Sequence, residues 1–336
     1  MNQPRREIPP HLKIQMDGPP YLGPATFFKT VGLSEPEQLD EWQPDVAVIG
    51  APWDGSSTIR AGARLGPRMI RLAHVVYPYW HLDLRVSPLD DLCVIDYGDA
   101  MCPPGLVEPA FAAIRERVSD VASRGIFPVI LGGDHSITYP AASAVAATRP
   151  TGTLGVIHFD AHADCVPEAF GNPLSHGTPM RRLIDSGAVP GRNFVQLGLR
   201  GFWPPEETFE WMAQQGMRSH RMSEFIEHGV DTIIDTAISE ALDGPEAIYI
   251  SVDVDVLEPG LAPGNGAPEP GGMLTADLLR ALQKIVLSTN VVALDVVEVN
   301  PLYDVGEVTS FVASRMITEV LSALARKRQG SAAEHR

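Results

Sequence analysis

Three short motifs in this sequence carry carboxylate and imidazole side chains at spacings that suit a metal centre. They are Asp160-Ala161-His162-Ala163-Asp164, Asp253-Val254-Asp255 and Gly133-Asp134-His135. In an extended backbone every second side chain points to the same side, so the two alternating motifs present their polar groups together. With His135 they offer four carboxylates and two imidazoles, from His135, Asp160, His162, Asp164, Asp253 and Asp255.

The number and type of these donors indicate two metal ions rather than one zinc ion. A catalytic zinc usually takes three protein ligands, whereas six ligands with bridging carboxylates suit two ions about 3.5–4 Å apart. Carboxylate and imidazole donors without thiolate favour Mn²⁺, with Ni²⁺, iron or cobalt as alternatives. A lone Asp-x-Asp motif is more often a cap or a solvated turn. Three uncompensated polar groups at one buried strand end are costly, however, so the sequence predicts a binuclear centre.

Short apolar runs alternate with helix-like stretches along the chain. We expect seven β-strands, four to eight residues long and rich in β-branched side chains, at 45–51, 92–97, 127–132, 154–160, 194–199, 247–252 and 291–297. We expect helices at 107–124, 223–242, 276–287 and 310–327. Strands that are apolar throughout and separated by helices predict an α/β fold with a mainly parallel sheet.

The candidate ligands follow these strands. His135, Asp160 and Asp253 stand at or just beyond the ends of three different expected strands, and Glu298 directly follows a fourth. In a parallel α/β sheet the carboxyl ends of the strands share one edge, where ligands bind. Four strand ends therefore deliver metal-type ligands to one place.

Composition limits the class of protein and its partners. The chain has 336 residues, of which 44% are hydrophobic, as in a soluble globular protein. A net charge of −16 argues against binding to nucleic acid or to an anionic membrane, and it suits a cationic substrate. Three scattered cysteines and no recognisable signal peptide or membrane-spanning run favour the cytoplasm. We expect one domain over 45–327, an irregular N-terminal arm over 1–44 and a frayed tail over 328–336.

The motifs GGDHS, FDAHAD, SVDVDVLEPG and DVVEVNP, in this order, resemble the ureohydrolase family of arginase, agmatinase and guanidinobutyrase. GARLGPRMIR, SHGTP and LGLRG resemble its agmatinase branch. The resemblance implies a three-layer α/β/α sandwich with about eight mainly parallel strands, and a homo-trimer or homo-hexamer. It also implies a binuclear manganese centre, although some relatives that hydrolyse guanidine or biguanides use nickel.

The same resemblance implies a role for each site residue. One ion would be held by His135, Asp160, Asp164 and Asp253, and the other by Asp160, His162, Asp253 and Asp255. A hydroxide bridging the two ions would attack the guanidino carbon and release urea, or a urea-like product, and an amine. Asp164 would pass on the proton of the nucleophile, His176 would shuttle protons or contact substrate, and Glu298 would anchor the guanidinium through paired hydrogen bonds.

Two departures from the family pattern leave the substrate open. Asn265 and Ala267 stand where the family usually has threonines, which changes the hydrogen-bonding groups near the substrate. Glu258 also replaces an aspartate of the family pattern, and we expect little effect from that change. Agmatine is the first expectation. Guanidinobutyrate, guanidinopropionate, guanidine and an N-substituted biguanide such as a dimethylbiguanide, hydrolysed with nickel, are alternatives. From another class, the chain could be a non-catalytic subunit that pairs with a paralogue in a hetero-oligomer.

Overall fold

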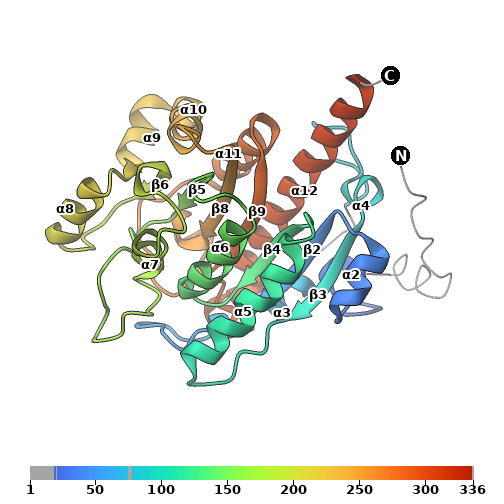
Figure 1. Cartoon of the computed structure of the whole chain (residues 1–336), viewed down its shortest axis with the longest axis horizontal. Coiled ribbons are helices and arrows are strands. Elements are labelled where there is room, and N and C mark those ends of the chain that lie inside the picture. Colours follow the sequence, from blue (N-terminus) through green and yellow to red (C-terminus); the bar gives the residue numbers. More distant parts are fainter. Residues whose placement is uncertain (1–18, 20, 75–77, 335–336) are drawn as a thin grey trace.

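A nine-stranded parallel sheet forms the centre of the protein (Figure 1). The computed structural model describes residues 19, 21–74 and 78–334. The strand order is β1-β3-β2-β4-β9-β8-β5-β6-β7, and the strand pairs in the described residues are parallel. The strands are β1 (Val31–Gly32), β2 (Val46–Ala51), β3 (Val94–Asp99), β4 (Phe127–Gly132), β5 (Leu154–Phe159), β6 (Phe194–Leu199), β7 (Arg218–Arg221), β8 (Ala247–Asp253) and β9 (Val291–Val297).

All seven expected strands are present within two residues of their predicted bounds. The sheet has nine strands rather than about eight because two short edge strands, β1 and β7, join it. β1 has two residues, and β7 is the polar segment Arg-Ser-His-Arg. Neither segment contains an apolar run, because an edge strand is not enclosed on both faces as the central strands are.

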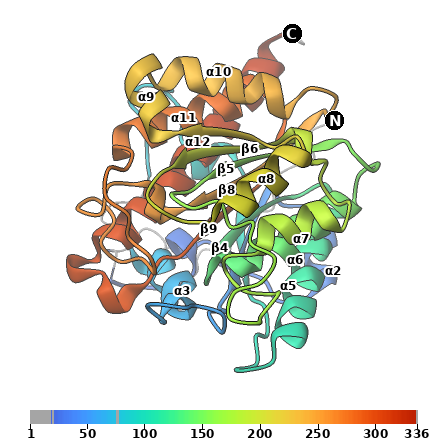
Figure 2. The same cartoon turned by 90° about the vertical axis from the view of Figure 1, so that its left-hand side faces the viewer.

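Helices cover both faces of the sheet, which gives the expected α/β/α sandwich (Figure 2). The helices are α2 (Pro36–Trp42), α3 (Gly66–Leu72), α4 (Pro88–Asp91), α5 (Val107–Ala122), α6 (Thr138–Ala147), α7 (Pro179–Asp185), α8 (Glu206–Gln214), α9 (Met222–His228), α10 (Val230–Ala241), α11 (Thr275–Ser288) and α12 (Val308–Glu334). One apolar core lies between the sheet and α3, α9, α10, α11 and α12. The other lies between the sheet and α2, α5, α6, α7 and α8.

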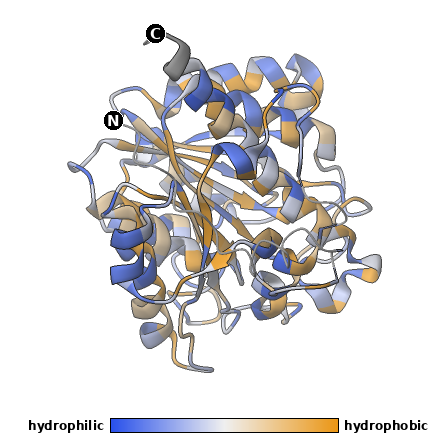
Figure 3. Cartoon of the chain, turned by 90° about the vertical axis from the view of Figure 1, so that its right-hand side faces the viewer, coloured by the Kyte–Doolittle hydropathy of each residue, from blue (hydrophilic) through white to orange (hydrophobic). Residues whose placement is uncertain are grey.

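Side chains along each central strand alternate between these two cores. In β8, Ile248, Ile250 and Val252 belong to the first core, whereas Ala247 and Tyr249 belong to the second. Successive side chains of a strand point to opposite faces, so a strand covered on both sides is predominantly apolar. In Figure 3 the central strands are largely coloured as hydrophobic, whereas the helices around them carry both hydrophilic and hydrophobic residues.

Three expectations about the helices and chain ends are corrected. The expected irregular arm over 1–44 contains β1 and α2, although residues 1–18 and 20 lie outside the described part of the chain. The single helix expected over 223–242 is two helices, because Gly229, at φ 79°, separates α9 from α10. The tail expected to fray from 328 instead continues α12 to Glu334.

In the described part of the chain, the last helix is the one segment whose length and composition would suit a membrane span. Its stretch Val305–Gly330 meets those criteria, but 72% of the most apolar window is buried inside the protein. α12 packs against α11, α3 and α4. Its apolar character is therefore explained by its place in the core.

Candidate metal centre

The candidate ligands meet at the carboxyl edge of four neighbouring central strands, β4, β9, β8 and β5. The backbone turns sharply into a short 3₁₀ segment after β4 (His135–Ile137) and after β8 (Val254–Val256). Asp134 and Asp253 cap these turns by accepting backbone N–H bonds from Ser136 and Asp255. Each turn thus places its polar side chains immediately above a buried strand.

One group of ligands surrounds the Nδ1 atom of His135. This nitrogen lies 3.0 Å from Asp160 Oδ2 and 3.1 Å from both Asp164 Oδ2 and Asp253 Oδ2. His135 is fully buried, and its Nδ1 has no hydrogen bond of acceptable geometry in the described residues. Three carboxylate oxygens thus converge on one buried nitrogen that has no hydrogen-bond partner of its own, an arrangement that a divalent cation would satisfy.

A second group shares Asp160 with the first. His162 Nδ1 lies 2.9 Å from Asp255 Oδ2 and 3.6 Å from Asp160 Oδ1. Backbone amides hold these carboxylates, since His162 N donates to Asp160 Oδ1 at 2.6 Å and Ala161 N donates to Asp255 Oδ1 at 3.0 Å. The six residues predicted from the sequence therefore form one cluster with two potential metal positions.

The electrostatics of the cluster also favour cations. Burial raises the pKa of Asp255 to about 6, with Asp160 adding to the effect. Burial and the neighbouring Asp255 and Asp160 raise the pKa of Asp253 well above its usual range. Burial alone would lower the pKa of His162, but Asp255 and Asp160 raise it to about 12. The crowded carboxylates thus attract positive charge, which divalent ions would supply.

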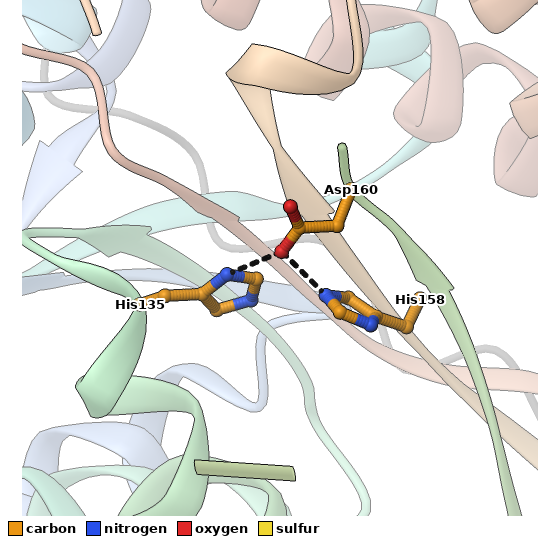
Figure 4. Close-up of side chains that lie close together, drawn as sticks. All are labelled: His135, His158 and Asp160. Atoms are coloured by element: carbon orange, nitrogen blue, oxygen red, sulfur yellow. Dashed lines mark hydrogen bonds and ion pairs between the residues drawn. The ribbon is translucent and has the colours of Figure 1, made fainter. Parts of the chain in front are cut away.

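Residues behind the ligands were missed by sequence reasoning. Asp160 Oδ2 faces two imidazoles, His135 and His158, and His158 Nε2 lies 2.9 Å from it (Figure 4). Ser251 Oγ lies 3.0 Å from His135 Nε2, and Gln196 Nε2 lies 3.2 Å from His158 Nδ1. Such outer partners orient metal ligands. Their only signal in the sequence is a polar residue inside an otherwise apolar strand.

Glu298 and His176 lie beside the cluster. Glu298 Oε1 accepts a hydrogen bond from the backbone N–H of His135 at 3.0 Å, and His176 Nδ1 lies 3.2 Å from the same oxygen. Glu298 Oε2 is buried without a hydrogen-bond partner in the described residues. A Cβ added to Gly266 would lie 2.6 Å from this oxygen, so the glycine keeps the space in front of it open. On its other side His176 contacts Thr58, whose Oγ1 lies 2.9 Å from Nε2.

The sequence profile of the arginase family matches residues 44–323. The chain belongs to the arginase family. A guanidinopropionase from Pseudomonas aeruginosa is 39% identical over 320 residues, which are 94% of this chain and 96% of that protein. A mitochondrial agmatinase from Gallus gallus is 35% identical over 292 residues, 87% of this chain and 84% of that protein. Among solved structures, proclavaminate amidinohydrolase from Streptomyces clavuligerus gives a TM-score of 0.83 at 35% identity, covering 92% of this chain and 100% of that one.

As a member of the arginase family, the chain is a hydrolase that acts on guanidino compounds. The family uses a binuclear centre of divalent metal ions, and the chemistry of the His/Asp cluster fits such a centre. Asn265, which the sequence predicts to lie near the substrate, is part of the loop between β8 and α11. It is fully buried, its Nδ2 donates to Ala262 O at 2.7 Å, and its Oδ1 has no partner in the described residues. It neighbours Gly266, so it shapes the loop in front of Glu298.

Proposed function

We propose that this chain hydrolyses a C–N bond of a small guanidino compound with two divalent ions, manganese being the first choice and nickel the alternative. The observation that carries the proposal is the convergence of three carboxylate oxygens on the buried His135 Nδ1. One position would use His135, Asp160, Asp164 and Asp253, and the other Asp160, His162, Asp253 and Asp255. A loaded binuclear centre lowers the pKa of water and supplies a nucleophile at neutral pH.

The protein's own residues bind the substrate and move its protons. Glu298 Oε2 accepts an N–H bond from the guanidinium, because this buried oxygen has no other partner in the described residues. Asp164 accepts the proton that the attacking water loses, and His176 donates a proton to the departing nitrogen. Addition of water to the guanidinium then gives urea and a protonated amine, with atoms and charge balanced.

Among guanidino compounds we favour a guanidino acid, because the backbone of Arg60 lies near Gly266, the residue in front of Glu298. The backbone oxygen of Arg60 lies 3.9 Å from the position of a Cβ on Gly266, and it accepts a hydrogen bond from Asn300 at 3.0 Å. The Arg60 guanidinium stacks over the ring of Tyr303, 4.8 Å from its centre, and it has no ion pair in the part of the chain described. We propose that this guanidinium receives the carboxylate of the substrate. The 39% identity to a guanidinopropionase supports the same class.

A product screen on the purified chain tests both the proposed reaction and the proposed substrate class. The protein is loaded separately with Mn²⁺ and Ni²⁺ and offered 3-guanidinopropionate, 4-guanidinobutyrate, agmatine, arginine, guanidine and N,N-dimethylbiguanide, with urea and amines identified by mass. We expect strongest turnover of a guanidino acid. Faster turnover of agmatine would overturn the substrate class but keep the reaction. Silence with both metals bound would contradict the reaction itself and support the partner-subunit alternative.

Assembly and location are part of the proposal. We propose a homo-oligomer, a trimer or hexamer, that is active without a paralogous subunit and works in the cytoplasm. The activity of the chain purified alone tests whether it needs a paralogous subunit. Its mass in solution, measured by light scattering, tests whether it is a trimer or hexamer.

A further inference from the structure

Arg200, in the loop after β6, is a half-buried cation that forms no direct ion pair with a carboxylate in the described residues. Burial lowers its pKa below the usual value. Its guanidinium instead donates to backbone carbonyls of two separate segments. Partial burial of a charged group costs free energy unless its N–H groups find acceptors, and these carbonyls supply the acceptors.

The first segment is the 3₁₀ turn that carries Asp255. Arg200 Nη2 donates to the carbonyl of Asp255 at 2.7 Å and to that of Leu257 at 3.2 Å, and Nη1 donates to that of Val256 at 3.2 Å. The Asp255 side chain contacts His162 at the second metal position. The guanidinium therefore holds the backbone of a proposed ligand from behind.

The second segment is the loop that faces the substrate anchor. Arg200 Nη2 and Nε donate to the carbonyl of Glu269 at 2.6 Å and 3.1 Å, and Nε also donates to that of Pro270 at 3.2 Å. Glu258 ties the same loop down by accepting N–H bonds from Gly271 and Gly272, both at 2.8 Å. The loop includes Gly266, which borders Glu298.

From these contacts we infer that Arg200 is a positioning residue that fixes the second metal position and the substrate loop together. The planar guanidinium reaches both segments at once, which a single ammonium group does not. The inference rests on the proposed binuclear site, because Asp255 matters here as a ligand. Arg200 acts through the backbone of Asp255 and does not touch the reacting atoms.

A purely electrostatic effect of Arg200 would change the metal affinity in the opposite direction from a positioning effect, so the two explanations can be told apart by experiment. A positive charge near a cation site repels the metal, and its removal in Arg200→Met should then tighten binding, whereas Arg200→Lys should change little. Positioning predicts that both variants weaken the second site. Loss of an outer partner of a metal ligand typically costs about 10–100-fold in affinity.

The experiment titrates Mn²⁺ into the metal-free full chain by calorimetry and counts bound ions by elemental analysis. The wild type should take up two ions per chain. Both Arg200 variants should keep the first with unchanged affinity, bind the second about 10–100-fold more weakly, and show a raised KM at saturating metal.

The matched control is Arg71→Lys. Arg71 is buried more completely than Arg200, and it pairs with Asp96 at 2.7 Å and with Asp99 at 2.5 Å on β3, which β2 separates from the ligand-bearing β4. This variant can lose stability, but it should bind both ions as the wild type does. Fewer than two ions in the wild type would overturn the binuclear proposal itself. Two ions bound normally in Arg200→Lys would overturn only the positioning role of Arg200. If Arg200→Met does not fold, the conservative variant Arg200→Lys alone tests that role.

Discussion

Asp253 is the carboxylate on which both metal positions depend in the proposed site. Its Oδ2 faces His135, and its Oδ1 caps the turn that carries Asp255. Asp253→Asn keeps the shape of the side chain but removes its charge, so we expect loss of both ions. Loss of a residue that only contacts a metal ligand costs up to about 100-fold, so loss of this ligand should lower kcat/KM by at least about 100-fold. Elemental analysis and kinetics on the same sample measure both effects. Asp235→Asn, at a surface carboxylate paired with Lys284, is the control and should change neither. Two ions retained with full activity would refute the site.

Glu298 should separate substrate binding from metal binding. Glu298→Gln has the same length and can keep the positive φ of 63°, but it loses the charge of the guanidinium anchor. A hydrogen bond to a charged group contributes about 1.5–3 kcal/mol, so kcat/KM should fall about 10–100-fold, mainly through KM. Metal content should stay at the wild-type value. Loss of metal instead would show that Glu298 belongs to the metal shell.

His176 should set the alkaline limit of activity. Burial favours its neutral form, but the hydrogen bond and charge of Glu298 raise the pKa of His176 to about 9. A proton donor whose pKa is raised is protonated at lower pH and loses its proton as the pH rises through that value. The charge of bound divalent ions opposes the shift, so kcat/KM of the loaded enzyme should fall between the ordinary pKa of about 6.5 and 9. In Glu298→Gln the descending limb should move to lower pH, and an unmoved limb would assign it to another group.

At the scale of elements, the sequence predicted the central strands and the ligand cluster at their carboxyl ends. β4, β5, β8 and β9 are mostly apolar, and the polar residues at or just after the end of each strand mark the edge of the sheet, so the cluster followed from the strand ends. The sequence analysis missed elements that lack this pattern of a mostly apolar strand ending in polar residues. The Ala-rich α6 is buried almost all round and shows little periodicity, and the polar edge strand β7 has no apolar run. Contacts across the fold, such as Thr58 with His176, depend on loop conformations that no local pattern specifies.

The turn between β4 and His135 has no room for a side chain. A Cβ on Gly133 would lie 1.7 Å from the backbone oxygen of Trp53, so Gly133→Ala must displace either β4 or the neighbouring loop. We expect a loss of several kcal/mol in the free energy of unfolding, in the range of strong overpacking, together with weaker metal binding through His135. Gly260→Ala, where a Cβ meets nothing within 4 Å, is the control and should be within about 1 kcal/mol of the wild type. Urea unfolding of metal-free protein measures both, and an unaltered midpoint for Gly133→Ala would contradict this packing.

At the scale of the whole molecule, the metal centre joins distant parts of one sheet. Its residues come from segments after β4, β5 and β8, and Asp160 contacts ligands from two of these segments. Metal-free, the same carboxylates repel one another at the centre of a chain of net charge −16. Folding and metal loading should therefore be strongly coupled.

This coupling predicts a thermal shift that depends on metal concentration. A ligand that binds only the folded state stabilises it by about 2.7 kcal/mol at 100 times its Kd, so saturating Mn²⁺ should raise the melting temperature by several degrees. Addition of a chelator should reverse the shift. Asp253→Asn removes the repulsion together with the proposed ligand, so its metal-free form should melt no lower than the metal-free wild type, while Mn²⁺ should have little further effect. Differential scanning calorimetry with and without metal gives all four values. A wild type whose melting temperature is insensitive to Mn²⁺ and Ni²⁺ would show that the cluster does not bind these ions in the folded state.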